Sequence, residues 1–466
     1  MGTKNSDVHI KGGVLVNSSR IALGDVFIKD GLVESIEPPG TSKTADKVIN
    51  AEGKLVLPGI VESHLHPVYA DRLETLSKSA VYGGITTLIP YIGAVKAWGV
   101  EGNLWDAVNY FIEEGARDSC IDFGLHCSLV ADDLNDLEKL IPKICERGIR
   151  SFKGFMAYKR RGMYLSDTDI LRILAALKES GGLFCVHAEN GDLCDFLEDR
   201  FRAEGKTGPE YYAPSRPNIC EAEAAFRILS LAKTIDCPIY IVHVSTKETL
   251  QVIDMFRKWG SGPIYTETCT HYLTLTNNEM LKMGSLAKVS PPLRESKDVN
   301  ALWEAIIDGK VDVIGADTAG HLIDTKEPRW GDVFKAPAGL PGQETMFTVT
   351  YDEGYNRRSV SLCRLVELMA EKPAKIFGLY PRKGVLQPGS DADVLIFDPM
   401  KDHTVYASEQ HTKTDYTMFE SRHCLGKPEM VLQRGRVILE NGEMTAEKGF
   451  GQFLEASPLD MTGSSI

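Results

Sequence analysis

The stretch Leu57-Pro58-Gly59-Ile60-Val61-Glu62-Ser63-His64-Leu65-His66-Pro67 is an apolar run that ends in two histidines separated by one residue. Side chains two positions apart on a β-strand point to the same face, so His64 and His66 would present two imidazoles to one point in space. Such a pair can hold a metal ion, and the alternative is a pair of hydrogen-bonded histidines at a strand end. The rest of the chain favours the metal site.

Short apolar or β-branched runs alternate with helical stretches further along the chain, which is typical of βα units around a parallel sheet. The expected strands cover residues 57–66, 85–92, 121–128, 149–156, 183–188, 239–245, 263–270 and 312–317. A (β/α)8 TIM barrel needs eight such strands and carries its chemistry at their C-terminal ends. The predicted fold class is therefore α/β, with a (β/α)8 TIM barrel.

Polar side chains lie near the ends of these strands. They are His64 and His66 on the first strand, Lys153 on the fourth, His187 on the fifth, His243 on the sixth and Asp317 on the eighth. A lysine is rarely buried without a partner, so Lys153 within an apolar run needs an explanation. A buried ion pair, an outward-pointing register or a place in a metal site would each provide one.

Together the six positions predict a site for two divalent ions. Two ions about 3.5 to 4 Å apart need a bridging anion, which an unmodified lysine cannot supply. A lysine carboxylated by carbon dioxide can, because the carbamate has two oxygens. The first ion would be bound by His64, His66 and Asp317 and the second by His187 and His243, with carboxylated Lys153 and a hydroxide shared between them. This ligand set suits zinc best, and manganese or iron could occupy it.

Seven motifs extend over nearly the whole chain. They are Pro-Gly-Ile-Val-Glu-Ser-His-Leu-His at 58–66, Ser-Phe-Lys-Gly-Phe-Met-Ala-Tyr-Lys at 151–159, Val-His-Ala-Glu-Asn at 186–190, Val-His-Val-Ser at 242–245, Glu-Thr-Cys at 267–269, Ser-Pro-Pro-Leu-Arg at 290–294 and Asp-Tyr-Thr-Met-Phe-Glu at 415–420. In this order they resemble the cyclic amidohydrolases, and most closely the hydantoinase and dihydropyrimidinase branch. The resemblance implies the barrel and the two-metal site.

The resemblance also implies an activity, the metal-dependent opening of a cyclic amide or ureide ring to an N-carbamoyl amino acid. Asp317 would accept the proton of the attacking water and pass it to the leaving ring nitrogen. Tyr158 would hydrogen-bond the oxyanion; its alternative is a packed aromatic side chain. Ser290 and residues near Ala338 would bind the ring amide through backbone groups. No organic cofactor is expected, because the glycine-rich segments lack a phosphate-loop pattern.

The chain departs from that branch at four places. Glu62 replaces the usual Asp, Thr318 replaces a histidine that normally follows the catalytic aspartate, and Ala338 replaces a frequent Asn. The loop over residues 67–72 also differs in length and content. His321 is a candidate for the missing histidine, and the substrate range is the property that these changes affect most.

The mouth of the barrel is expected to be apolar, because Val68, Tyr69, Ile92 and Trp98 lie on the loops after the first two strands. A ring with a neutral exocyclic group should then be preferred, since burying an unpaired carboxylate costs several kcal/mol. Allantoinase and dihydroorotase are alternatives, but they usually carry Arg or Asn just after the histidine pair, where this chain has Pro67. A non-catalytic assembly protein of the same fold is a further alternative; such proteins have lost ligands that this chain retains.

The chain of 466 residues has room for a barrel and a smaller unit, and we expect four parts. Residues 1–56 and 391–450 would form a small β-sandwich built from both termini, residues 57–390 the barrel, and residues 451–466 a mobile tail.

A net charge of −13 argues against nucleic acid or membrane partners, and no basic cluster is longer than Lys159-Arg160-Arg161. The 10 cysteines lack the spacing of a disulfide framework, and no signal peptide is apparent, so a cytoplasmic protein is expected. By analogy with the branch it would be a homo-oligomer, a tetramer or a dimer.

Overall fold

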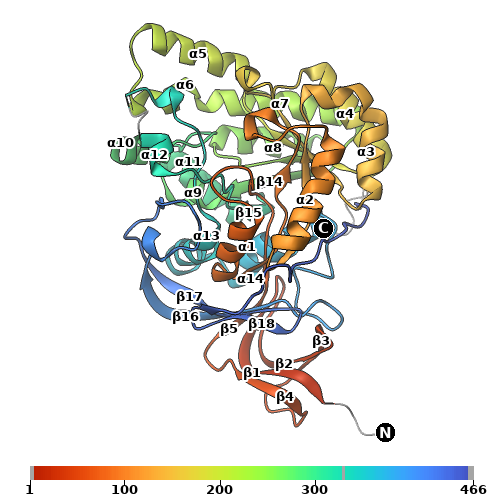
Figure 1. Cartoon of the computed structure of the whole chain (residues 1–466). Coiled ribbons are helices and arrows are strands. Elements are labelled where there is room, and N and C mark those ends of the chain that lie inside the picture. The colour runs from red at the N-terminus through yellow and green to blue at the C-terminus, as the bar shows by residue number, and fades with distance from the viewer. Residues whose placement is uncertain (1–4, 328–330, 460–466) are drawn as a thin grey trace.

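The computed structural model describes residues 5–327 and 331–459. Parallel strands from the middle of the chain lie inside a layer of helices, and a sheet built from both ends of the chain lies against one end of this body (Figure 1). The inner strands are β6 (Ile60–Glu62), β7 (Ile85–Leu88), β8 (Tyr91–Ile92), β9 (Asp122–Phe123), β10 (His126–Ser128), β11 (Ser151–Phe155), β12 (Leu183–His187), β13 (Ile239–Ile241), β14 (Ile264–Cys269) and β15 (Val313–Gly315).

These strands form two parallel sheets, one in the order β15-β14-β13-β12-β11-β10-β8 and one in the order β6-β7-β9. The two sheets are linked by hydrogen bonds, among them Tyr91 N–H to the carbonyl of Leu65 (2.9 Å). At the other edge, Leu65 and Thr318 form a parallel bridge, in which the His66 N–H donates to the Thr318 carbonyl (2.9 Å). All eight predicted strand regions are present, although three are interrupted, at 59, at 89–90 and at 124–125.

Helices follow most of these strands. They are α1 (Leu73–Tyr82), α2 (Leu104–Asp118), α3 (Leu137–Glu146), α4 (Asp167–Ser180), α5 (Gly191–Ala203), α6 (Tyr212–Ser215), α7 (Asn218–Ile235), α8 (Lys247–Lys258), α9 (Thr270–Thr274), α10 (Asn278–Met283), α11 (Ser296–Ile307), α12 (Ile323–Lys326), α13 (Gln343–Tyr351), α14 (Leu362–Val366) and α15 (Lys372–Ile376).

Local sequence explains the ends of helices such as α4. The Ser166 side chain accepts a hydrogen bond from the Asp169 N–H, and Gly181 ends the helix in the left-handed region (φ 64°). In the described part of the chain, no helix is both long and apolar enough to span a bilayer.

The terminal sheet has nine strands and joins both ends of the chain. Its members are β1 (Ser6–Val16), β2 (Ile21–Lys29), β3 (Leu32–Glu37), β4 (Ala45–Asn50), β5 (Leu55–Pro58), β16 (Val394–Thr404), β17 (His423–Gln433), β18 (Arg436–Glu440) and β19 (Glu443–Met444). A buried apolar cluster within it contains residues from both ends, including Ile10, Val26, Val394 and Leu432. The two ends of the chain therefore share one buried apolar cluster.

Two expectations about boundaries were wrong. The single strand over 57–66 is two strands, because β5 pairs with β16 and β1 in the terminal sheet before the chain enters the inner sheet at Ile60. The expected tail is partly docked: the Leu454 N–H donates to the carbonyl of Phe123 (2.7 Å) and the Ala456 N–H to that of Gly148 (2.8 Å). Residues 460–466 lie outside the described part.

Candidate functional site

The first histidine pair and the aspartate after β15 meet at one point. The Nε2 atoms of His64 and His66 lie 3.1 and 3.4 Å from the same oxygen of Asp317. All three residues are buried, and their ligand atoms lie within 4.8 Å of one another. The turn after β6 is held by the buried Glu62, whose carboxylate accepts the N–H groups of His64 (2.6 Å) and Ala316 (3.0 Å). Glu62 thus joins the two segments that carry these ligands.

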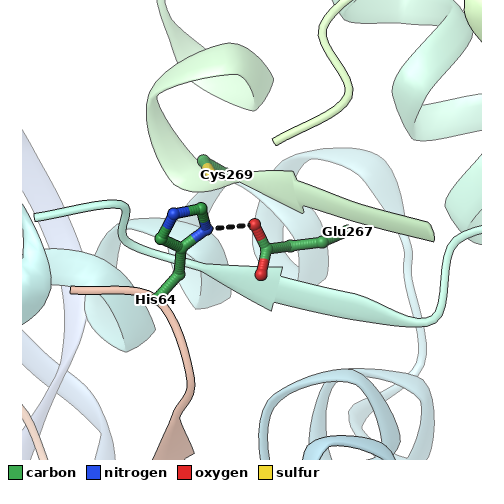
Figure 2. A group of neighbouring side chains, drawn as sticks. All are labelled: His64, Glu267 and Cys269. Carbon is green, nitrogen blue, oxygen red and sulfur yellow. Dashed lines mark hydrogen bonds and ion pairs between the residues drawn. The ribbon is translucent and has the colours of Figure 1, made fainter. Parts of the chain in front are cut away.

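The other nitrogen of His64 faces away from Asp317. Its Nδ1 lies 2.5 Å from Glu267 on β14, and Cys269 lies beside them (Figure 2). Glu267 also accepts hydrogen bonds from the Tyr240 hydroxyl (2.8 Å) and the His243 N–H (2.9 Å). Burial raises the pKa of the Cys269 thiol well above its usual range, so it stays protonated. The contact between Glu267 and the Nδ1 of His64 therefore orients the His64 ring.

Lys153 lies at the centre of the buried cluster. Its Nζ is 2.9 Å from the Nε2 of His64 and 4.3 Å from the centre of the Tyr91 ring. Burial lowers the pKa of Lys153 below its usual value. The negative charges of Asp317 and Glu267 act in the opposite direction, but the effect of burial is larger. The ion pair and the outward-pointing register considered from the sequence are both absent, since Lys153 is 2% exposed and no carboxylate among the described residues lies within ion-pair distance of it.

His187 and His243 form the second half of the cluster. The Nδ1 of His187 lies 2.9 Å from the Nε2 of His243. The opposite nitrogen of His187 is held by Glu189 (2.7 Å), which also accepts a hydrogen bond from Arg216 (2.6 Å). The Nδ1 of His187 is thus directed toward His243 by the contact with Glu189 on the other side of its ring. Sequence reasoning missed the roles of Glu189, Arg216 and Glu267. For the two glutamates, the signal that could have identified them was an acidic residue on or beside an apolar strand.

The protonation states of this cluster suit metal binding. Burial lowers the pKa of all four histidines, and the charge of Lys153 lowers each further. Burial would raise the pKa of Asp317, but His64, His66 and His243 hold it well below its usual range. Neutral imidazoles and an ionised carboxylate are the forms that bind divalent ions. The donor set therefore fits the predicted metals.

A small pocket opens onto this cluster. Its lining includes His66, Lys153, His187, His243 and Asp317 together with the three expected substrate contacts, Tyr158, Ser290 and Ala338. Tyr158 follows β11 in a left-handed conformation (φ 68°), and its ring centre lies 4.7 Å from that of His187. Burial raises the pKa of Tyr158 well above its usual range, so the hydroxyl remains a donor. The Ser290 hydroxyl is hydrogen-bonded to that of Tyr212.

The departures from the branch have structural consequences. His321 does not replace the missing histidine beside Asp317: no hydrogen bond or ion pair between these two residues occurs in the described chain. Its Nε2 contacts the carbonyl of Ala338 (3.2 Å), and it lines an outer cavity that continues from the pocket. Gly339 follows in a left-handed conformation (φ 138°), and a Cβ there would lie 2.2 Å from the Ala319 carbonyl, so only glycine fits.

The apolar lining expected from the sequence is only partly present. Tyr69 and Trp98 line the pocket, whereas Val68 and Ile92 are buried in the core and do not. Arg161 also lines the pocket and was not expected there, because it lies on a segment far from the first two strands. The mouth is therefore aromatic and cationic rather than purely apolar.

Comparison with known proteins shows which family the chain belongs to. The profile described as "Amidohydrolase family" matches residues 55–438, which is most of its 466 residues. This chain belongs to the amidohydrolase family. Family members are binuclear metal enzymes, in keeping with the donor set described above.

Similar proteins show which branch of the family this amidohydrolase resembles. A D-hydantoinase of Ralstonia pickettii is 36% identical and aligns over 96% of this chain and 98% of its own length. An L-hydantoinase of Paenarthrobacter aurescens is 35% identical, with 96% and 98% covered. The crystal structure of dihydropyrimidinase from Brevibacillus agri matches with a TM-score of 0.92, 33% identity and 97% and 99% coverage. The resemblance to the hydantoinase branch is confirmed.

Proposed function

We propose that this amidohydrolase opens cyclic ureides of the hydantoin or dihydropyrimidine type to N-carbamoyl amino acids. The observation that carries the proposal is the convergence of six side chains. Five of them line one pocket, and His64 contacts Lys153 and Asp317; the five are His66, Lys153, His187, His243 and Asp317. Relatives named D-hydantoinase, L-hydantoinase and D-phenylhydantoinase support the same reaction class. In this reaction water adds to a ring carbonyl, the carbon–nitrogen bond breaks, and the nitrogen gains a proton.

Two divalent ions, most suitably zinc, would be held by His64, His66 and Asp317 on one side and by His187 and His243 on the other. When bound, such ions supply an activated water at neutral pH. Carboxylated Lys153 would complete both sets of metal ligands. The depressed pKa of Lys153 supports this, because only the neutral amine reacts with carbon dioxide.

The side chains at the pocket suit the remaining steps. Asp317, an ionised carboxylate, would accept the proton released by the attacking water and return it to the leaving ring nitrogen. The protonated hydroxyl of Tyr158 would donate a hydrogen bond to the oxyanion. Ser290 and Ala338 would bind the ring amide through backbone groups, as their position on the pocket wall allows.

The proposal includes the architecture. We infer that the two parallel sheets close into one (β/α)8 barrel over residues 57–390, which is supported by the bridge between Leu65 and Thr318. The residues at 1–56 and 391–450 would form a β-sandwich, supported by their shared buried cluster. A homo-oligomer, tetramer or dimer, remains an expectation by analogy. Cytoplasmic location is supported by ten free cysteines, nine of them buried.

Three other functions are less well supported. Allantoinase or dihydroorotase would use the same ligands, but Pro67 follows the histidine pair where those enzymes usually have Arg or Asn. A non-catalytic assembly protein is disfavoured because all six ligand positions are present and converge.

The test measures metal content and ring opening together. Zinc-loaded protein would be incubated with hydantoin, 5-phenylhydantoin, dihydrouracil, allantoin and dihydroorotate, and the ring-opened products quantified. We expect two metals per chain and turnover of hydantoins or dihydrouracil that is lost with a chelator. Turnover of allantoin or dihydroorotate alone would favour those activities, and a metal-free protein without turnover would favour the assembly protein.

A further inference from the structure

The turn that follows Tyr158 carries three consecutive basic residues, Lys159, Arg160 and Arg161. The first two are tied to α5. Lys159 forms an ion pair with Asp192, and Arg160 forms ion pairs with Asp199 (2.6 Å) and Glu198 (3.3 Å). These contacts tie the turn to α5.

Arg161 has a different environment. No hydrogen bond or ion pair of its side chain occurs within residues 5–327 and 331–459, and its guanidinium lies 5.3 Å from the centre of the Tyr158 ring. It lines both the inner pocket, with Asp317 and His66, and the outer cavity. The turn is fixed by the N–H groups of Arg161 (3.0 Å) and Met163 (3.3 Å), which both donate to the Tyr158 carbonyl.

The other cations of the outer cavity are already satisfied. Arg216 is paired with Glu189 (2.6 Å) and Lys335 with Asp332 (3.3 Å). Lys288 donates to three backbone carbonyls. The acids of this cavity, Asp195 and Glu198, both lie within ion-pair distance of Arg160. Among the described cations of this cavity wall, Arg161 is therefore the one whose side chain has neither an ion pair nor a hydrogen bond.

We propose that Arg161 selects cyclic ureides whose exocyclic group ends in a carboxylate. The inference rests on the proposed function and names its substrate class. The aromatic side chains of Tyr69, Trp98 and Phe155 line the inner pocket and would contact a short methylene linker. The carboxylate at its end would meet a guanidinium, which binds carboxylates in a two-pronged geometry. This differs from the neutral substituent that the sequence alone suggested.

The test compares two hydantoins of equal shape and different charge. These are 5-(2-carboxyethyl)hydantoin and 5-(2-carbamoylethyl)hydantoin, assayed as separate enantiomers with the wild-type enzyme, Arg161→Gln, Arg161→Lys and the control Lys335→Gln. We expect the wild-type ratio of kcat/KM to favour the carboxylate. Arg161→Gln should lower that ratio at least about fivefold, Arg161→Lys should retain part of it, and Lys335→Gln should leave it unchanged. High salt should reduce the preference, because the pair is partly exposed.

Calorimetric titration of the same two rings separates this inference from the proposed function. If neither ring is opened but the carboxylate binds more tightly and only when Arg161 is present, the inference stands and the function fails. If hydantoins are opened with no preference between the two rings, or if Arg161→Gln leaves the ratio unchanged, the inference is overturned and the function stands.

Discussion

At the scale of single residues, the site depends on a buried lysine that has no carboxylate partner. Lys153 is 2% exposed and touches His64 and the Tyr91 ring. An unmodified lysine in this position would repel the metal ions that the surrounding imidazoles attract. Carboxylation, as proposed, would turn the same side chain into a ligand and would account for both its burial and its neighbours.

Lys153→Ala is expected to lose most of its bound metal and at least about 100-fold in kcat, because the shared ligand is removed. Short-chain carboxylic acids should restore part of the activity by occupying the space of the carbamate. Metal analysis and turnover of hydantoin with and without added propionate would check this, with the exposed Lys139→Ala as control. A variant that retains two metals and full turnover would contradict carboxylation.

Glu267 illustrates a residue that sequence reasoning left without a role. Its carboxylate holds the Nδ1 of His64 at 2.5 Å, so the Nε2 of that ring faces Asp317. Glu267→Gln should therefore lower zinc affinity about 10- to 100-fold while the fold is kept. Competition with a chelator would measure the affinity, and the exposed Glu146→Gln provides a matched control. Unchanged zinc affinity would mean that the His64 ring is oriented by packing alone.

At the scale of elements, the loops that form the pocket wall are held by buried lysines. Lys288 donates to the carbonyls of Val333 (2.9 Å), Phe334 (3.2 Å) and Ala336 (2.6 Å). Lys326 donates to the carbonyls of Leu286 (3.0 Å), Lys288 (3.1 Å) and Gly339 (2.6 Å). These contacts connect the segment before Ser290 to the segment around Ala338, so two irregular loops form one wall.

The pKa of Lys288 makes this arrangement sensitive to pH. Burial, with the nearby charge of Arg216, lowers its pKa from 10.5 to about 7. Between about pH 7 and pH 10.5, Lys288 is protonated in the unfolded chain and largely deprotonated in the folded one. The contribution of Lys288 to the free energy of unfolding therefore rises with pH in this range. Below about pH 7 both states hold the proton and the cost of burying the charge is constant.

The free energy of unfolding of wild-type protein minus that of Lys288→Met should therefore increase steeply from pH 7 to pH 9 and by much less from pH 6 to pH 7. Urea unfolding of both proteins at each pH would show it, and subtraction removes groups that titrate alike in both. A difference that is constant over this range would mean that Lys288 titrates near its ordinary value in the folded protein.

The positions of the strands, and the meeting of polar residues at their ends, were open to prediction for a physical reason. The apolar runs and the polar residues that interrupt them are local in sequence, and parallel strands bring their ends together in any barrel. Loops are different, because their paths depend on contacts such as those of Lys288 and Lys326. Arg161 at the pocket and the docked segment 451–459 were therefore missed, as was the division of the stretch 57–66 into two strands.

At the scale of the whole molecule, the parallel sheets and the terminal sheet are joined by a buried charge cluster. Lys383 lies 2.7 Å from Asp122 on β9 and 2.9 and 2.7 Å from Asp391 and Asp393, which precede β16. Arg434, after β17, also pairs with Asp122. One buried ammonium thus holds carboxylates from both parts of the fold.

Lys383→Met should lower the free energy of unfolding by about 3 to 5 kcal/mol, because it leaves three carboxylates at most 9% exposed without their shared cation. Urea unfolding of the variant beside Lys401→Met, an exposed position on β16, would measure the loss. At low denaturant the folded variant should keep the wild-type kcat, since Lys383 does not line the pocket. A loss no larger than that of Lys401→Met would show that the apolar contacts between the two parts hold them together without the charge cluster. A two-step transition in Lys383→Met would instead show that the cluster is what makes the two parts unfold as one.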